Sequence, residues 1–524
     1  MLSTLEVAKH NSSQSCWVII SDKVYDVTDF LHDHPGGPNS ILRYAGKDAT
    51  EEYDTIHPAG TIQRHLSLDK HLGPVDNTTL ASEPRNAEAR GSTQNSPPST
   101  FKMDSRSEET QGPLITHISV CQNLDDIESV ARQRLSRKAW VYYDSAADSL
   151  NSFITNRLDW AKISFRPRVL RNVARVNLTR RVLGHEASLP FFISPAAMAK
   201  LGHPDGELCL ARGAAETNIV YCASTYSSVA HDELAPCFDR REGRGALSFQ
   251  LYVPKKKEDA KKLIEMAKNL KCKSLVITVD TPVVGKREED DRYKAKLEVR
   301  EGREIPRTPA PAEGEEAPIL RGYHSSTVDW EDIRWMRKQW GAEHGPVVLK
   351  GIQTAEDAYL ASLNGVDAIY LSNHGGRQLD FAPSSIRTLL EIRTFFPHVL
   401  ESMDVYLDGG VRRGTDIVKA LCLGARGVGL GRPFLYGLSA FGTDGVVKAI
   451  ESKLSTHERR ALTSANNILV LSEEIETTMR LLGVTDLNRL GPTYVNCTRL
   501  AQELPPADVV DVDAVARRML KQKL

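Results

Sequence analysis

The 524-residue sequence has no Cys-x-x-Cys pair, no excess of charge of either sign and no run of about 18 apolar residues. Its eight cysteines are scattered singly, which argues against a disulfide framework or a structural zinc site and favours a reducing compartment. Without a long apolar run, no membrane-spanning helix is expected. A net charge of −1 gives no electrostatic footprint for a nucleic-acid partner.

The N-terminal residues also lack the features of a targeting segment. The opening stretch, MLSTLEVAKHNSS, has neither the apolar core of a signal peptide nor the Arg-rich face of a transit peptide. The residues alone therefore favour a cytoplasmic location.

The composition divides the chain into segments, and its length predicts two or three domains. Residues 1–75 alternate short apolar runs with turns, and CWVIISDKVYDVTDFL predicts a β-hairpin with Ser21-Asp22 at its turn. Residues 76–112 carry almost no large apolar side chains and predict a flexible linker, because they cannot bury enough surface to offset the entropy of ordering. A globular segment follows over residues 113–500, and residues 501–524 form a C-terminal tail.

The long globular segment repeats short apolar runs with helical stretches between them. Such runs are typical of buried parallel strands, and their alternation with helices indicates βαβ units. Eight units over roughly 250 residues predict a (β/α)₈ TIM barrel. The runs are 191–198, 219–225, 247–253, 274–280, 346–351, 368–373, 405–410 and 427–431.

The spacing between the fourth and fifth runs is more than twice the others, from Asp280 to Lys350. Within it, residues 298–318 are charged and rich in proline. Because a long structureless loop in a compact domain is usually functional or disordered, we expect a mobile loop over the mouth of the barrel here.

Polar residues end six consecutive runs, where the active sites of such barrels lie. One polar residue after a strand would be ordinary, but a lysine that ends a buried strand, Lys350, needs an anion or a ring acceptor. The glycines after the last two runs would let backbone N–H groups approach a phosphate. The sequence GVGLG could also belong to a dinucleotide fingerprint, but no acidic residue follows at the required spacing.

At these strand ends the sequence resembles a known family. SNHGGRQLD, LVITVDTP, QLYV, LGHPDGE and DGGVRRGTDIVKALCLGARGVGLGRP are similar to motifs of the FMN-dependent α-hydroxy acid dehydrogenases and oxidases, over roughly residues 115–495. DVTDFLHDHPGG near the N-terminus resembles the hallmark of cytochrome b5-type haem domains. The resemblance implies a small α+β haem domain followed by a TIM barrel, with FMN and haem b as cofactors.

The resemblance also implies catalytic roles for individual residues. His374 would be the base that takes a proton from the substrate, and Asp280 would stabilise its imidazolium. Arg377 would hold the substrate carboxylate by a bidentate pair. Three further side chains would contact or neighbour the substrate: Tyr142, Tyr252 and Arg287.

Other residues are implied to hold FMN. Lys350 would face the N1–C2=O edge and stabilise the reduced ring. The isoalloxazine would be held by Ser224, Gln250, Thr278 and Ser372, with the backbone of Ala196 and Ala197 near N5. The ribityl chain and phosphate would be held by Asp408, Gly409, Gly410, Arg412, Gly431 and Arg432.

Two histidines in the first segment are expected to be haem ligands. Pro35-Gly36-Gly37 forces a tight turn after His34, and two helical segments that follow the turn would wall a pocket with Ile41, Leu42 and Ile56. His34 and His57 would fill both axial positions of the iron, which suits electron transfer. A degenerate fold without haem and a zinc site are the alternatives, and both are disfavoured. His10 and His32 are interpreted as surface residues.

Together these features predict FMN-dependent oxidation of an L-2-hydroxy acid, with L-lactate as the leading candidate. Electrons would pass to the haem and then to an external acceptor such as cytochrome c. Two alternatives are an oxidase that returns electrons to oxygen and a haem electron carrier with an inactive barrel. The resemblance further implies a homotetramer in the mitochondrial intermembrane space. Tyr226 leaves the substrate open, since lactate-oxidising relatives carry Leu and glycolate-oxidising ones Trp at this position.

Overall fold

A computed structural model describes residues 2–34, 37–58, 60–76, 117–238, 244–300, 322, 324–450, 470–507 and 509–510. Several sequence predictions fall wholly or partly outside these residues: the Pro35-Gly36 turn, the linker beyond Asp76, the proline-rich stretch beyond Arg300 and the tail beyond Val510.

Residues 2–76 fold around a six-stranded sheet with the order β1-β6-β4-β3-β2, and β5 pairs with β3. The strands are β1 (Leu2–Ser3), β2 (Asn11–Ser12), β3 (Ser15–Ile20), β4 (Lys23–Asp26), β5 (Lys47–Asp48) and β6 (His71–Asp76). The helices are α1 (Thr4–Val7), α2 (Pro38–Leu42), α3 (Thr50–Ile56) and α4 (Thr61–His65). This mixed sheet with short helices is the α+β arrangement predicted for the segment.

The predicted hairpin is confirmed, because β3 and β4 pair in antiparallel register on either side of Ser21 and Asp22. Both turn residues have positive φ, 49° and 60°. Two consecutive left-handed residues give the turn twist that matches paired strands. The hairpin places α2 and α3 beside a core that includes Val18, Tyr25 and Leu42.

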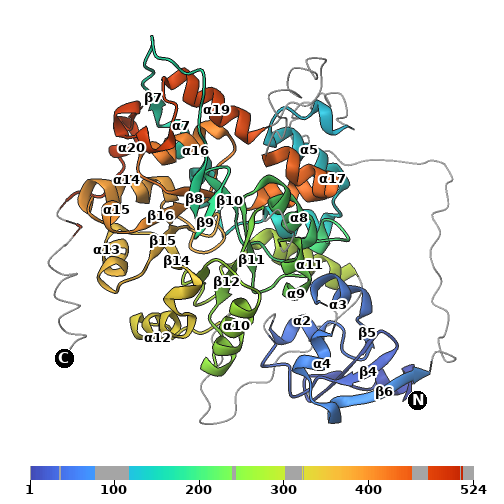
Figure 1. Cartoon of the computed structure of the whole chain (residues 1–524). Coiled ribbons are helices and arrows are strands. Elements are labelled where there is room, and N and C mark those ends of the chain that lie inside the picture. The colour runs from blue at the N-terminus through green and yellow to red at the C-terminus, as the bar shows by residue number, and fades with distance from the viewer. Residues whose placement is uncertain are drawn as a thin grey trace, which may run out of the picture.

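The second globular segment contains a closed barrel of eight parallel strands in sequential order, as predicted (Figure 1). Each strand lies within one of the eight apolar runs or extends one residue beyond it, and is largely buried, which is why the runs are continuous rather than alternating. The strands are β10 (Phe191–Ile193), β11 (Val220–Ser224), β12 (Ala246–Tyr252), β13 (Leu275–Thr278), β14 (Val347–Ile352), β15 (Ala368–Leu371), β16 (Asp404–Leu407) and β17 (Gly427–Leu430).

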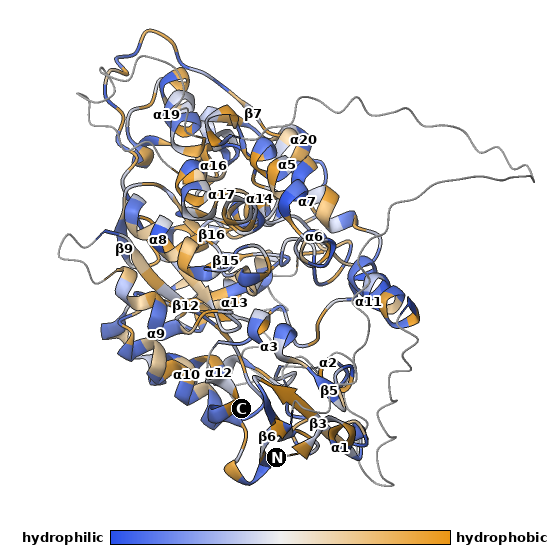
Figure 2. Ribbon diagram, turned by 90° about the vertical axis from the view of Figure 1, so that its right-hand side faces the viewer, coloured by the Kyte–Doolittle hydropathy of each residue, from blue (hydrophilic) through white to orange (hydrophobic). Residues whose placement is uncertain are grey.

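Helices surround the barrel and precede it. α10 buries Ala260, Ile264 and Ala267 against the strands, and Figure 2 shows it to be largely hydrophilic. The surrounding helices are α8 (Glu207–Thr217), α9 (His231–Leu234), α10 (Lys257–Asn269), α11 (Glu288–Arg300), α12 (Trp330–Trp340), α13 (Ala355–Leu363), α14 (Ser385–Phe395), α15 (Val399–Ser402), α16 (Gly414–Cys422) and α17 (Arg432–Ile450). The other helices are α5 (Leu124–Arg134), α6 (Arg137–Asp144), α7 (Asn151–Ala161), α19 (Leu471–Leu482) and α20 (Thr498–Ala501).

A hairpin closes the barrel at the N-terminal ends of its strands. It consists of β8 (Arg180–Val182) and β9 (His185–Ala187), and its Val182 and Leu183 belong to one buried cluster with Phe192 of β10. The opposite end, where the strands finish, is therefore the end left for a ligand. A two-stranded pair of β7 (Ser164–Phe165) and β18 (Val495–Asn496) lies outside the barrel.

The connection between β13 and β14 differs from the expected loop. α11 occupies Glu288–Arg300 and α12 occupies Trp330–Trp340, so the prediction of a structureless segment is wrong for these residues. Apolar residues are sparse in α11. This helix therefore shows no apolar periodicity from which it could be predicted.

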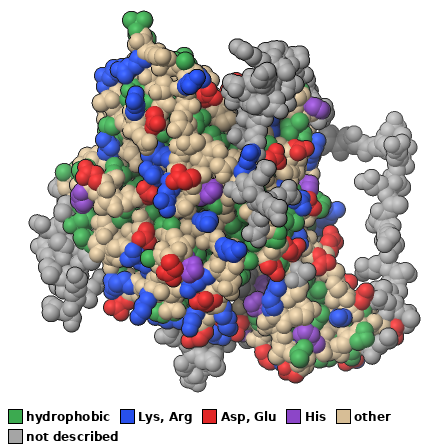
Figure 3. All heavy atoms as spheres, in the orientation of Figure 1, with side chains coloured by type: hydrophobic (Ala, Val, Ile, Leu, Met, Phe, Trp, Pro, Cys, Tyr) green, Lys and Arg blue, Asp and Glu red, His purple; other side chains and the backbone are tan. Residues whose placement is uncertain are grey.

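Positive and negative side chains are interspersed on the face shown in Figure 3, without a patch of one sign. In the described parts of the chain, no helix is both long enough and apolar enough to cross a membrane.

Candidate functional site

His374 lies at the mouth of the barrel between a carboxylate and a phenol. Its Nδ1 is 3.0 and 3.2 Å from the two carboxylate oxygens of Asp280, and its Nε2 is 3.1 Å from the hydroxyl of Tyr252. Its φ of +60° is uncommon for a residue with a side chain, and Ser372 Oγ accepts its backbone N–H at 3.0 Å. A Cβ at Gly351 would lie 2.6 Å from Asp280 Cβ, so only glycine lets β14 pass so close.

The hydrogen bonds fix the tautomer of His374. A carboxylate only accepts hydrogen bonds, so Nδ1 carries the proton and Nε2 keeps its lone pair toward Tyr252. Burial lowers the pKa of His374 and outweighs the opposing carboxylate of Asp280. Burial acts to raise the pKa of Asp280, but His374 and Lys350 hold it below its ordinary value. The pair is therefore a neutral imidazole beside an ionised carboxylate, as a general base requires.

Two half-buried arginines lie beside this pair. Arg377 donates to the backbone carbonyls of Tyr142, Tyr143 and Ser145 at 3.0, 3.1 and 2.8 Å. Burial, with the nearby Arg287, lowers the pKa of Arg377 to about 9. The Nε of Arg287 is buried without a hydrogen-bond partner. Within the described part of the chain, no acidic side chain forms an ion pair with either arginine, so the site suits an anionic ligand such as a carboxylate.

Lys350 begins a buried polar chain on the other side of His374. It is 3% exposed, and its Nζ donates to Ser372 Oγ at 3.2 Å. Ser372 in turn donates to Asp408 at 2.7 Å, and Tyr370 donates to the other oxygen of Asp408 at 2.9 Å. The nearest partner of the lysine is thus a hydroxyl rather than a carboxylate, which leaves its charge available to a ligand.

The remaining residues predicted to hold the flavin ring lie at the same end of the barrel. Gln250 donates to Thr278 Oγ1 at 2.8 Å and accepts from the backbone N–H of Thr225 at 3.2 Å. Ser224 ends β11, and Ala196 and Ala197 follow β10, half-buried. The structure therefore brings these residues together around one opening.

Arg412 and Arg432, both predicted to hold the FMN phosphate, have different partners in the structure. Arg432 begins α17, donates to the carbonyl of Gly375 and stacks 4.6 Å over the ring of Phe153, with no acidic partner among the described residues. Arg412 instead forms ion pairs with Asp125 and Glu128 of α5. Of these two arginines, Arg432 has the fewer charged partners among the described residues, and the binding of FMN phosphate by both stays a prediction.

The glycines after the last two strands also differ. A Cβ at Gly431 would meet only Ser194 Cβ, at 4.0 Å, so space remains around it. A Cβ at Gly410 would lie 2.0 Å from the carbonyl of Asn156, and the carbonyl of Gly409 accepts from Trp160. Close packing on α7 thus requires Gly410, which is a different reason from the predicted approach to a phosphate.

His34 and His57 in the first domain face each other at a ring-centroid separation of 6.0 Å. Metal–nitrogen bonds of about 2.0 Å on both sides would place the two rings at about this separation. Nδ1 of each ring lies 3.2 Å from a backbone carbonyl, of Gly37 and Tyr53 respectively, which leaves each Nε2 available as a ligand. Burial lowers the pKa of both, that of His34 to about 4, so both rings are neutral.

The other two histidines of the first domain differ. His32 is exposed, as interpreted from the sequence. His10 is half-buried, stacks 3.4 Å from the ring of Trp17 and lies 2.6 Å from Ser15 Oγ, so its interpretation as a surface residue is only partly right.

Two side chains important for this site were missed by the sequence reasoning. Glu207 is fully buried, and its carboxylate accepts from the backbone of Ala199, Ser228 and Val229 and from the Ser228 hydroxyl. It thereby fixes the loops after β10 and β11. His324, from the β13–β14 connection, lies 3.2 Å from the hydroxyl of Tyr226. The motif LGHPDGE, which ends in Glu207, was the only feature of the sequence that could have pointed to this residue. No sequence feature pointed to His324.

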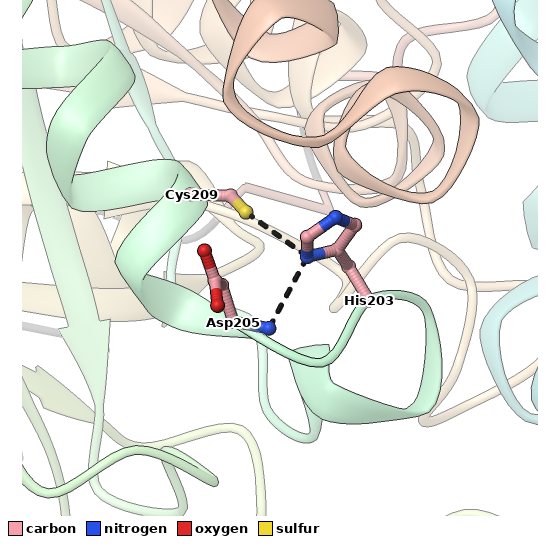
Figure 4. A group of neighbouring side chains, drawn as sticks. All are labelled: His203, Asp205 and Cys209. Carbon is pink, nitrogen blue, oxygen red and sulfur yellow. Dashed lines mark hydrogen bonds between the residues drawn. The ribbon is translucent and has the colours of Figure 1, made fainter.

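A cluster of His203, Asp205 and Cys209 lies away from the barrel mouth (Figure 4). His203 Nδ1 accepts from the backbone N–H of Asp205 at 3.2 Å and lies 3.4 Å from Cys209 Sγ. Asp205 is already paired with Arg212 at 2.7 Å. These contacts stabilise the turn that leads into α8, and a metal ion is not needed to explain why the three side chains lie together.

Comparisons with known proteins agree with this geometry. The family model "FMN-dependent dehydrogenase" matches residues 131–497, and "Cytochrome b5-like Heme/Steroid binding domain" matches residues 3–76. L-lactate dehydrogenase (cytochrome) of Wickerhamomyces anomalus is 37% identical over 95% of this chain and 80% of its own. Glycolate oxidase 1 of Zea mays is 35% identical over 71% of this chain and 95% of its own. A double mutant of flavocytochrome b2 with pyruvate bound matches with a TM-score of 0.64 and 34% identity, over 75% of this chain and 91% of that one.

Proposed function

Since the chain belongs to the FMN-dependent dehydrogenase family and carries a cytochrome b5-like haem domain, we propose that it oxidises an L-2-hydroxy acid, L-lactate first among them, to the 2-oxo acid. FMN supplies an acceptor for two electrons, and a haem with two axial histidines supplies a one-electron outlet. The observation that carries the proposal is the position of His374, which lies between Asp280 and Tyr252 beside two half-buried arginines that form no ion pair in the described part of the chain.

The substrate is held by its two oxygen-bearing groups. Arg377 and Arg287 bind its carboxylate, which supplies the negative charge that these half-buried cations lack. Tyr252 and Tyr142 donate hydrogen bonds to the carboxylate and hydroxyl. His374 takes the substrate proton at Nε2, and the imidazolium that forms is stabilised by Asp280 at Nδ1.

The residues at the strand ends fit FMN. Lys350, which is buried and donates to the Ser372 hydroxyl, would supply a positive charge to the N1–C2=O edge of the ring. Gln250, Thr278, Ser224 and Ser372 supply hydrogen bonds to the ring, with Ala196 and Ala197 beside it. Arg432 and the open backbone at Gly431 would hold the phosphate, and Asp408 would hold the ribityl chain. Arg412, Gly409 and Gly410 follow β16 and would complete the phosphate site, with Gly410 packed on α7.

The first domain fits haem b. It contacts the barrel domain near Tyr142, one of the residues proposed to bind the substrate. His34 and His57 offer Nε2 atoms to the iron. Glu52 of α3, the helix that ends before His57, pairs with Lys138 of α6, the helix that carries Tyr142. This contact supports electron transfer from the barrel to the haem within one chain.

A substrate and acceptor panel tests the proposal. Purified holoenzyme is given L-lactate, glycolate, L-mandelate or a longer 2-hydroxy acid, and the 2-oxo acid, hydrogen peroxide and reduced cytochrome c are measured. We expect 2-oxo acid formation coupled to cytochrome c reduction, with little peroxide. Stoichiometric peroxide would favour the oxidase alternative, and no product from any acid would favour a haem carrier with an inactive barrel.

The acceptor, assembly and compartment belong to the same proposal. A cytochrome as acceptor is supported by the name L-lactate dehydrogenase (cytochrome), which the similar enzymes of Wickerhamomyces anomalus and Saccharomyces cerevisiae share, and we propose that it is of the c type. A homotetramer in the mitochondrial intermembrane space follows from resemblance to the family, and the cytoplasm is the alternative. Native mass spectrometry and cell fractionation test these two points, and a monomer or a cytoplasmic signal would contradict them.

A further inference from the structure

Tyr370 is a fully buried tyrosine inside the barrel that takes no part in the proposed chemistry. It lies on β15 and is paired in register with Lys350 of β14. The ammonium of Lys350 is 5.5 Å from the centroid of the Tyr370 ring, within the distance at which an aromatic face attracts a cation. Lys350 forms no ion pair among the described residues, so this ring and the Ser372 hydroxyl are the contacts that hold its charge.

Two hydrogen bonds fix the hydroxyl of Tyr370. It donates to Asp408 Oδ2 at 2.9 Å and lies 2.8 Å from Ser194 Oγ. Since a phenol has one proton and Asp408 accepts it, Ser194 is the donor to Tyr370. Burial and the carboxylate of Asp408 raise the pKa of Tyr370, so the hydroxyl keeps this proton. The ring therefore cannot turn without losing both bonds.

The interior of the barrel is shaped to admit this ring. Gly429 lies on β17, and a Cβ there would clash with the Tyr370 hydroxyl and with Ser194 Oγ, so only glycine leaves room for them. Phe192 of β10 packs on Tyr370 at 5.4 Å between centroids, with the ring planes 78° apart. Tyr370 is thus held in one position by its neighbours on three other strands.

The Tyr370 hydroxyl also occupies a carboxylate that Lys350 would otherwise meet. Asp408 accepts from Tyr370 at one oxygen and from Ser372 at the other, at 2.7 Å. Ser372 in turn accepts from Lys350 at 3.2 Å, so a hydroxyl stands between the ammonium and the carboxylate. Loss of the Tyr370 hydroxyl would free one oxygen of Asp408, and direct pairing with it would neutralise the charge of Lys350.

We propose that Tyr370 is a positioning residue for Lys350, which keeps the ammonium directed at FMN rather than at Asp408 and thereby raises the reduction potential of the flavin. The inference rests on the proposed function, in which Lys350 supplies its charge to the N1–C2=O edge of the ring. A positive charge beside that edge stabilises the reduced ring, which carries more negative charge than the oxidised ring. An aromatic face suits this task because it attracts a cation without cancelling its charge.

The test is a spectroscopic redox titration of FMN in the full-length holoenzyme, with the haem absorbance recorded alongside. Tyr370→Phe keeps the ring but removes the hydroxyl, and Tyr370→Leu removes both. In Tyr370→Phe we expect the equilibrium constant for flavin reduction to fall about tenfold, the effect of one hydrogen bond to a charged group, which lowers the two-electron midpoint potential by about 30 mV. Tyr370→Leu should lower the potential further, because the cation–π contact is lost as well. The haem potential should not change.

Two controls separate this role from ordinary packing. Tyr406→Phe is the same chemical change on the neighbouring strand, where Tyr406 is paired in register with Tyr370 but its hydroxyl accepts from the backbone N–H of Leu183. This variant should leave the flavin potential unchanged. In an Asp408→Asn background, Tyr370→Phe should have little further effect on the potential, because no carboxylate is left there for Lys350 to pair with.

The outcomes distinguish this inference from the function on which it rests. Bound FMN with an unchanged or raised potential in both Tyr370 variants overturns the role of Tyr370, and so does an equal fall in Tyr406→Phe. A full effect of Tyr370→Phe in the Asp408→Asn background overturns the competition for Asp408. An unsubstituted protein that shows the expected shifts in its variants, but whose flavin no 2-hydroxy acid reduces, overturns the proposed function alone. Absorbance of bound FMN and haem reports folding, and Tyr370→Phe is the milder change if Tyr370→Leu does not fold.

Discussion

The first domain and the barrel use the same side chain in two ways. His34, His57 and His374 all keep a proton on Nδ1 and a lone pair on Nε2, because an oxygen accepts from Nδ1 in each case. In the first domain that oxygen is a neutral backbone carbonyl, and each Nε2 is left to a metal. In the barrel it belongs to the carboxylate of Asp280, and Nε2 meets a hydroxyl. The group that accepts from Nδ1 therefore decides the role of the histidine. A carbonyl suits a metal ligand that stays neutral, and a carboxylate suits a base that becomes charged.

The surroundings reinforce this difference. His57 is stacked on Tyr53 at 4.6 Å, and His34 lies edge-on to Phe30, so aromatic rings flank the pair. Around His374 lie Lys350 and two arginines, which favour an anionic substrate. A neutral pocket suits a haem, and a cationic one suits a carboxylic acid.

The largest expected effect is in the first domain. His34→Ala removes one of two axial ligands, so we expect loss of the six-coordinate haem spectrum and of cytochrome c reduction. Flavin reduction by L-lactate should persist at close to the original rate, because the barrel is untouched. Absorbance spectra and stopped-flow traces measure both. A surviving six-coordinate spectrum would refute the assignment of His34.

In the barrel, His374→Ala should have the converse effect. Without its base, flavin reduction by any 2-hydroxy acid is expected to fall by about a thousandfold, within the range of general-base catalysis. Bound FMN and the haem spectrum should be unchanged. His398→Ala, on the outer face beside Tyr359, is the matched control, and equal rates in both variants would contradict the assignment of His374.

Asp280→Asn tests the comparison between the two regions directly, since it gives His374 a neutral partner like those of the haem ligands. Flavin reduction should fall by about a hundredfold, because the imidazolium loses its counter-charge. Asp280 raises the pKa of His374, so its loss lowers that pKa further, and the imidazole stays neutral to lower pH. The acid limb of the kcat/KM profile should therefore move to lower pH. A shift to higher pH would contradict this electrostatic account.

The smallest expected effect separates the two arginines. Arg432→Met should weaken FMN binding by about 10- to 100-fold, the value of a charge-assisted hydrogen bond to phosphate. Arg412→Met should weaken it by less than about threefold, because Arg412 is paired with Asp125 and Glu128. Fluorescence titration of the apoprotein gives both dissociation constants. Equal losses would place Arg412 on the phosphate as well.

The features predictable from sequence were those with a local pattern. Each barrel strand is a continuous apolar run, and Ser21-Asp22 marks a turn that needs two positive φ values. Contacts between distant segments were not predictable, because no local pattern encodes them. The pairing of Arg412 with α5, the packing of Gly410 on α7 and the bond between Tyr226 and His324 all depend on tertiary packing.

Anaerobic stopped-flow mixing of the full-length holoenzyme with L-lactate tests the central claim most directly, with flavin and haem absorbance followed in the same trace. The account predicts that the flavin is bleached first and the haem is reduced after it, at a rate independent of protein concentration. A haem that stays oxidised while the flavin is reduced, or a flavin that no 2-hydroxy acid bleaches, would contradict it.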